Sequence, residues 1–208
     1  IVEIEKACMV TADMHLTAMR TVRPGIRESE VAAAVAEVAL AANYQLSFPI
    51  IGTINGQTLH NHHHGNMIKS GDLYLLDAGA ETEMGYAGDM TSTIPADATF
   101  TTRQKEIYDI VIASHEASFA ALRPGVTFES VYDLSAKVIF EGLKALGFMR
   151  GNADEAVKAG AHALLYPHGL GHMMGLDVHD MENLGEIYVG HDGKPKSTQF
   201  GRKSLRLG

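Results

Sequence analysis

The chain has 208 residues, of which 46% are apolar and 20% charged, and its formal net charge is -8. These values are typical of a globular protein with one sizeable core or at most two small domains. The acidic balance argues against a nucleic-acid partner, because contacts to phosphate groups need clustered lysine and arginine. The longest apolar stretch, 31–42, is interrupted by Glu37. It is shorter than the about 20 residues of a membrane span, so we expect no membrane partner.

A single cysteine, Cys8, allows no disulfide within this sequence. This fits a reducing compartment, and we expect a cytoplasmic location. The sequence opens with Ile1 rather than methionine and enters a helical pattern at once. We therefore expect the chain to be part of a longer protein.

In chain order, the periodicity predicts two helices, then strands, then two further helices and a second strand-like region. The helices are expected over 3–22, 28–43, 102–122 and 128–146, and the strands over 46–54, 73–78, 85–94 and within 163–180. In the strand 85–94, alternation places Asp89, Thr91 and Thr93 on one face.

A duplication organises these elements. Arg23-Pro24-Gly25-Ile26 recurs as Arg123-Pro124-Gly125-Val126, and each Pro-Gly turn separates two helical patterns. The flanks recur as well, since His15 corresponds to His115 at the same offset. The sequence therefore predicts an α+β domain built from two helix-helix-sheet halves, about 1–100 and 101–208, related by a pseudo-two-fold axis.

Two acidic residues stand where the first half carries its strands. Asp77 ends the apolar run 73–78, and Asp89 follows after one hairpin length. A buried carboxylate must be paired, hydrogen-bonded or bound to metal. Two neighbouring carboxylates repel each other, and a divalent cation relieves that repulsion. Taken singly, Asp77 also fits a turn cap and Asp89 a solvent-facing side chain.

The segment 168–180 concentrates histidines and acids between glycines. It contains His168, His172 and His179 together with Asp177 and Asp180. Its glycines disfavour a metal-binding helix and instead let the backbone pass close to a ligand. We expect Asp177 and His179 to share one face of a strand. The run 62–64, three adjacent histidines, is instead predicted to be a solvated loop, because adjacent side chains point in different directions.

Three segments together resemble a known family. They are the run LLDAGAE, from Leu75 to Glu81 with Asp77 inside it, the run GYAGDMT around Asp89, and the run HGLGHMMGLDVHD from His168. Together they are similar to the Xaa-Pro aminopeptidase and Xaa-Pro dipeptidase (prolidase) family. That family shares the pita-bread fold with methionine aminopeptidase and creatinase. The resemblance implies one catalytic pita-bread domain over 1–208, without the amino-terminal domain usual in the family and without the carboxyl-terminal end of the catalytic domain.

The resemblance also assigns roles. Asp77, Asp89 and His172 would be metal ligands, and His60, His168 and His179 would contact the substrate and stabilise its developing oxyanion. The cofactors would be two divalent ions bridged by a water or hydroxide, with Mn²⁺ favoured and Co²⁺ or Zn²⁺ as alternatives. The substrate would be a peptide or dipeptide with proline at the second position, cleaved at the Xaa-Pro bond.

Departures from the family pattern limit this expectation. Two glutamate ligands of the family have no counterpart in the sequence, so we expect weak metal binding and little or no activity from these 208 residues alone. A methionine-aminopeptidase-like enzyme and a non-catalytic pita-bread binding module are the alternatives. Dipeptidase against aminopeptidase preference, the physiological metal and a homodimeric state stay open.

Overall fold

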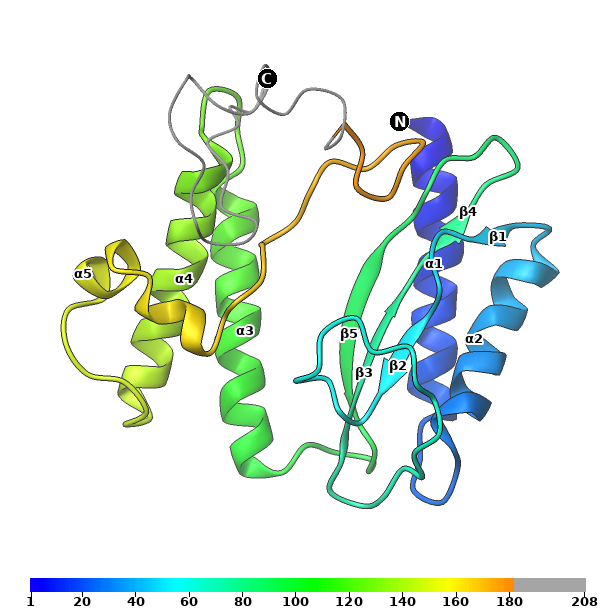
Figure 1. Cartoon of the computed structure of the whole chain (residues 1–208), viewed down its shortest axis with the longest axis horizontal. Coiled ribbons are helices and arrows are strands. Elements are labelled where there is room, and N and C mark those ends of the chain that lie inside the picture. The colour runs from blue at the N-terminus through cyan, green and yellow to red at the C-terminus, as the bar shows by residue number, and fades with distance from the viewer. Residues whose placement is uncertain (182–208) are drawn as a thin grey trace. The chain divides into compact units, whose positions relative to one another are not determined.

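The computed structural model describes residues 1–181, and they divide into two compact units. The first unit comprises 1–101 and 173–180, and the second comprises 102–172 with Met181. Figure 1 follows the chain through both, and each unit is described separately below. None of the helices in the described part of the chain combines the length and apolar character needed to cross a membrane.

The first unit opens with two helices, α1 (Val2–Thr21) and α2 (Glu28–Ala41). Acidic residues in the first turn of α1 and Arg20 in its last turn complement the helix dipole. The chain turns between the helices at Pro24 and Gly25, and Gly25 has a φ of 92° that other residues rarely adopt. The buried residues of α1 recur at helical spacing: Ala7, Thr11, Met14, His15 and Ala18.

A three-stranded antiparallel sheet packs against these helices in the order β2-β3-β5. Its strands are β2 (Ile51–Thr53), β3 (Leu73–Ala78) and β5 (Met90–Pro95), and a smaller sheet pairs β1 (Gln45–Leu46) with β4 (Ala80–Glu81). Burial alternates along β3, where Tyr74, Leu76 and Ala78 enter the core with α1 and α2. The intervening residues, Asp77 among them, therefore lie on the opposite face of the sheet.

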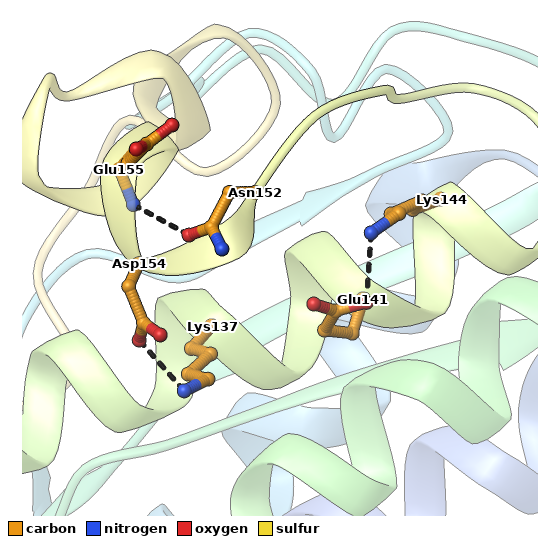
Figure 2. Close-up of polar contacts among 6 residues, drawn as sticks. All are labelled: Lys137, Glu141, Lys144, Asn152, Asp154 and Glu155. Atoms are coloured by element: carbon orange, nitrogen blue, oxygen red, sulfur yellow. Dashed lines mark hydrogen bonds and ion pairs between the residues drawn. The ribbon is translucent and has the colours of Figure 1, made fainter.

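The second unit contains α3 (Thr102–Ala121), α4 (Phe128–Ala145), α5 (Ala153–Lys158) and the short 3-10 helix η1 (Ala161–Leu164). Helices α3 and α4 approach closely where Ser114 and Ser135 share a buried hydrogen bond of 2.8 Å. The Asn152 side chain caps α5 by accepting from the Glu155 amide, and Lys137 joins α4 to α5 through an ion pair with Asp154 of 2.6 Å (Figure 2).

The four long helices predicted from the sequence are confirmed, and the strand at 73–78 has the predicted bounds. The predicted strand at 85–94 begins only at Met90. The backbone turns before that point, with Gly85 at a φ of 79°, so Asp89 lies immediately before the strand rather than within it.

The predicted strand within 163–180 is wrong. Residues Ala161–Leu164 form a 3-10 helix, and none of the described residues that follow belongs to a named strand. Asp177 and His179 therefore do not share a strand face. Strand-like composition produces a strand only where a neighbouring strand accepts and donates its backbone hydrogen bonds. Within 163–180, most backbone hydrogen bonds instead close local turns.

Candidate active site

Asp77 lies near the end of β3, on the sheet face opposite the helices. The register pairs Asp77 with Ile51 on one side and with Thr91 on the other. The Thr91 hydroxyl donates a hydrogen bond of 3.0 Å to Asp77 Oδ1. The cross-strand neighbour Thr91 thus orients this carboxylate.

The structure brings Asp89 next to Asp77. Burial raises the pKa of Asp77, and the negative charge of Asp89 and a hydrogen bond with its side chain raise it further, to about 6. Thr91 and the nearby His60 act in the opposite direction and do not offset these effects. Two carboxylates this close share a proton or bind a cation, so the pair suits a divalent metal ion.

Two glycines allow the Asp77 and Asp89 segments to meet. A Cβ added at Gly79 would collide with the backbone carbonyl oxygen of Gly88. A Cβ at Gly88 would lie 2.5 Å from Thr11 Oγ1 and 3.0 Å from the backbone of Ala7 in α1. The Gly88 amide donates to the Ala80 carbonyl at 2.8 Å. The backbone crossing beside both carboxylates therefore requires glycine at both positions.

His15 supports the same strands from the core side. Its Nδ1 lies 2.6 Å from Ser92 Oγ on β5, and its Nε2 lies 3.3 Å from the carbonyl oxygen of Ala78 on β3. Burial lowers the pKa of His15 despite opposing contributions from Ala78, Met90 and Asp89. The sequence motifs do not point to this residue, and its only signal in the sequence is its place on the buried face of α1.

His60 lies in the loop between β2 and β3, and its side chain is exposed. Its φ of 54° is uncommon for a residue other than glycine. A positive charge on its imidazole acts on Asp77 in the direction that lowers the pKa of that carboxyl. His60 therefore belongs to the same unit as Asp77 and Asp89, with a weak electrostatic influence on the pair.

The histidine run 62–64 occupies an irregular loop segment. His62 and His63 are exposed, whereas His64 is half-buried and its Nε2 lies 3.0 Å from the carbonyl oxygen of Ile50. Among the described residues, no three or more His, Cys, Asp or Glu side chains form a group that could hold a metal ion. The prediction of a solvated loop holds for His62 and His63, whereas His64 is partly buried.

His179 belongs to the first unit, in the segment 173–180. That segment is closed by a bond of 3.0 Å from the Asp180 amide to the Met173 carbonyl. It is also bound to the residues that lead into β5, because the Ala87 amide donates to the Gly175 carbonyl at 2.8 Å. The segment that carries His179 therefore contacts Ala87, which precedes Asp89 by two residues in the chain.

His168 and His172 belong to the second unit. The His168 ring meets Tyr166 edge-on with centroids 4.9 Å apart, and its Nδ1 lies 2.9 Å from the Gly169 carbonyl oxygen. Tyr166 stacks on Tyr132 of α4 at 5.3 Å. His172 is half-buried in the loop that follows. The aromatic core of this unit thus anchors the start of the histidine-rich segment.

Comparison with known proteins gives a consistent result. The model of metallopeptidase family M24 matches residues 2–200. The Xaa-Pro aminopeptidase of Escherichia coli K12 is 38% identical over 186 residues, which are 88% of this chain and 42% of that protein. Zn-substituted E. coli aminopeptidase P in complex with product superposes with a TM-score of 0.82 at 37% identity, covering 86% of this chain and 41% of that one. Proline aminopeptidase P II from Yersinia pestis gives 0.82 at 33% identity, over 86% and 42%.

The chain belongs to metallopeptidase family M24, and its α+β architecture is the pita-bread fold of aminopeptidase P. The family implies divalent metal ions, which agrees with the paired carboxylates of Asp77 and Asp89. The chain spans less than half the length of the relatives that it matches.

Proposed function

We propose that the protein is a metal-dependent aminopeptidase or dipeptidase that hydrolyses the Xaa-Pro bond at the amino terminus of peptides. The observation that carries this proposal is the Asp77–Asp89 pair, in which burial and the neighbouring negative charge of Asp89 raise the Asp77 pKa to about 6. The names of the relatives supply the substrate class, a peptide with proline at the second position. We propose a single catalytic domain for these 208 residues within a longer protein.

We propose Asp77, Asp89 and His172 as metal ligands. Carboxylates and one imidazole suit Mn²⁺, and also Co²⁺ or Zn²⁺. When bound, the ions would supply Lewis-acid activation of the attacking water and of the scissile carbonyl. The raised Asp77 pKa supports this assignment because metal and proton compete for the same pair of carboxylates. We propose Mn²⁺ as the metal. We also propose a cytoplasmic location, which the single cysteine suggests.

His60, His168 and His179 are proposed to act on the substrate directly. A neutral or protonated imidazole donates a hydrogen bond to the carbonyl oxygen, where negative charge develops during attack. The Xaa-Pro bond has no N–H, so recognition must rest on the free amino end, the carbonyl and the proline ring. The exposed side chain of His60 and its electrostatic effect on Asp77 support a place for it on the substrate side of the site.

Two alternatives remain distinct outcomes of the test. A methionine-aminopeptidase-like enzyme is disfavoured by relatives that are named Xaa-Pro aminopeptidases. A non-catalytic pita-bread module is disfavoured by the retained acidic pair. Since the family's two glutamate ligands have no counterpart in the sequence, we propose that the 208 residues alone bind metal weakly and have little or no activity.

The deciding experiment measures hydrolysis of an Xaa-Pro dipeptide and an Xaa-Pro-Pro tripeptide with Mn²⁺, Co²⁺ or Zn²⁺. It uses both these 208 residues and a longer chain that continues past residue 208. We expect metal-dependent cleavage by the longer chain, lost on chelation. Asp89→Ala should reduce kcat/KM by at least about a thousandfold, because removing a residue essential to catalysis typically costs that much or more. The preferred peptide distinguishes aminopeptidase from dipeptidase.

The control is Asp13→Ala, an exposed acid on α1, which should leave kcat/KM unchanged. Cleavage of a methionyl peptide without proline would favour the methionine-aminopeptidase alternative. Failure of the longer chain to cleave any of these peptides with any of the three metals would favour the binding module.

A further inference from the structure

Glu28, the first residue of α2, has a fully buried carboxylate. An isolated buried carboxylate is costly, so it must be compensated by hydrogen-bond donors. Burial alone would raise the pKa of Glu28, but hydrogen bonds from Ile54, Asn66 and Thr53 outweigh it and hold the pKa below its usual value. The side chain is therefore ionised at neutral pH, and its donors bind it as charge-assisted partners.

These donors come from the two ends of one loop. At the first end, Glu28 Oε1 accepts from Thr53 Oγ1 at 2.9 Å and from the Ile54 amide at 2.8 Å. At the second end, Glu28 Oε2 accepts from the Asn66 amide at 3.0 Å, and Asn66 Nδ2 donates to both oxygens at 3.1 and 2.9 Å. One carboxylate thus closes the base of the loop 55–65, which carries His60.

The body of this loop has little else to fix it. Residues 57–60 are exposed, and Leu59 keeps 51% of its surface. Internal hydrogen bonds are few and local, such as the Thr58 amide to the Asn55 carbonyl at 2.9 Å. Segments with few buried apolar contacts open at low free energy unless their ends are held.

His60 adds a second requirement. Its left-handed backbone, with φ of 54°, is disfavoured for a residue with a side chain. Such conformations persist where the surrounding structure imposes them. The other ties at the loop base are backbone bonds from 28 and 29 to 64 and 66, the Arg27 contact with the Gly65 carbonyl, and the His64–Ile50 bond. The His64–Ile50 bond also joins the two sides of the loop, but through a single contact, whereas the Glu28 carboxylate accepts five hydrogen bonds from the two ends.

We propose that Glu28 is a positioning residue, whose buried carboxylate holds both ends of the loop 55–65 and so fixes the position of His60. The part of this inference that concerns catalysis rests on the proposed function. The part that concerns loop order does not, because it follows from the hydrogen bonds alone.

Amide hydrogen exchange of the 208-residue chain, read by mass spectrometry on peptides that cover 55–65 together with the flanking Ile54 and Asn66 amides, tests loop order directly, because these two amides donate to Glu28. Glu28→Gln keeps the side-chain shape but removes the charge and turns an NH₂ group toward donors. Losing hydrogen bonds to a charged group should accelerate exchange about tenfold or more in these peptides. Peptides from β5 should exchange as in the wild type.

Glu30→Gln is the matched control. Glu30 lies in the same first turn of α2, and its exposed carboxylate accepts only from the Arg27 amide, at 2.7 Å. The substitution Glu30→Gln removes the same formal charge as Glu28→Gln, but the Glu30 side chain does not contact the loop. Exchange in 55–65 should therefore stay at the wild-type rate. Unchanged exchange in Glu28→Gln, or an equal increase across the whole first unit, would overturn the proposal.

Asn66→Ala serves if Glu28→Gln does not fold. It removes two of the five hydrogen bonds to Glu28 and keeps the charge and the backbone contact. Exchange in 55–65 should then rise several-fold above that of Glu30→Gln. No increase in this variant contradicts a role for Glu28 at the loop base.

Kinetics of the chain that shows activity test the positioning role. Glu28→Gln should lower kcat/KM about tenfold in the wild-type background and have little further effect in a His60→Ala background, because both changes act through one side chain. Additive losses contradict positioning through His60. Absence of hydrolysis by the wild type contradicts only the proposed function, and the exchange experiment still decides whether Glu28 holds the loop.

Discussion

At the scale of single residues, the site depends on positions where a side chain is excluded as much as on those that carry chemistry. Gly79 and Gly88 lie beside Asp77 and Asp89, and their backbones cross within contact distance. The sequence motifs around the two acids therefore combine metal-type ligands with a steric condition. This condition explains why glycine accompanies each acid in this structure.

Gly88→Ala should destabilise the folded chain by about 3 kcal/mol, because the added methyl group meets the backbone of α1 as well as Thr11. Urea unfolding measures the change in the free energy of unfolding. Gly171→Ala is the control, since its Cβ would meet only Phe128, at 3.9 Å. It should change the free energy of unfolding by no more than about 0.5 kcal/mol. Equal effects of the two substitutions would show that the crossing tolerates a side chain.

At the scale of elements, α1 does more than cover the sheet. Its Thr11 hydroxyl accepts from the Ala80 amide at 2.9 Å, and His15 joins β3 to β5. Both side chains are buried and reach the strands at the level of Asp77 and Asp89. The helix thus fixes the strand ends on which the candidate ligands lie.

His15 should make stability depend on pH. Because burial lowers its pKa below the ordinary 6.5, the unfolded state binds more protons than the folded state under acidic conditions. The contribution of His15 is fully present above pH 6.5 and decreases as the pH falls below that value. Asp77, with a pKa raised to about 6, changes stability in the opposite direction over part of this range. The His15 contribution is therefore read as the difference between the wild type and His15→Gln in urea unfolding between pH 5 and 8, and the stabilisation by His15 should decrease as the pH falls below 6.5.

The duplicated sequence offers the control for that experiment. His115 occupies the corresponding position on α3, where its side chain is exposed. His115→Gln should leave the dependence of stability on pH unchanged. A pH profile that His15→Gln does not alter would mean that the ring is not held neutral in the fold.

At the scale of the whole molecule, folding brings the acidic side chains of Asp77 and Asp89 together, and this arrangement favours binding of a cation. The proximity of Asp89 disfavours ionisation of Asp77 in the metal-free fold. A ligand that binds only the folded state recovers this cost and adds stability.

Metal should therefore stabilise the chain, and Asp89→Asn should reverse the balance. With Mn²⁺ at a hundred times its dissociation constant, the wild type should gain about 2.7 kcal/mol, and a chelator should remove the gain. Asp89→Asn should be more stable than the wild type without metal, because the repulsion is gone, yet show no gain with metal. Asp13→Asn, at an exposed site, should behave as the wild type. A metal response retained by Asp89→Asn would contradict the proposed role of Asp89 as a ligand.

The sequence alone predicts part of the fold and the family of this protein. The four long helices and the strand at 73–78 follow from local periodicity and Pro-Gly turns, which depend only on neighbouring residues. The family follows from short motifs whose residue types are tied to metal chemistry. Both are local signals, so no tertiary contact was needed to find them.

Tertiary structure decided the rest. Whether 163–180 forms a strand depends on a pairing partner, and whether Asp89 lies inside a strand depends on the backbone crossing at Gly88. Glu28 and His15 look ordinary in the sequence, as the opening residue of one helix and a buried residue of another. Their parts emerge only when residues 38 and 77 positions away supply the hydrogen bonds, because a long-range contact leaves no trace in local pattern.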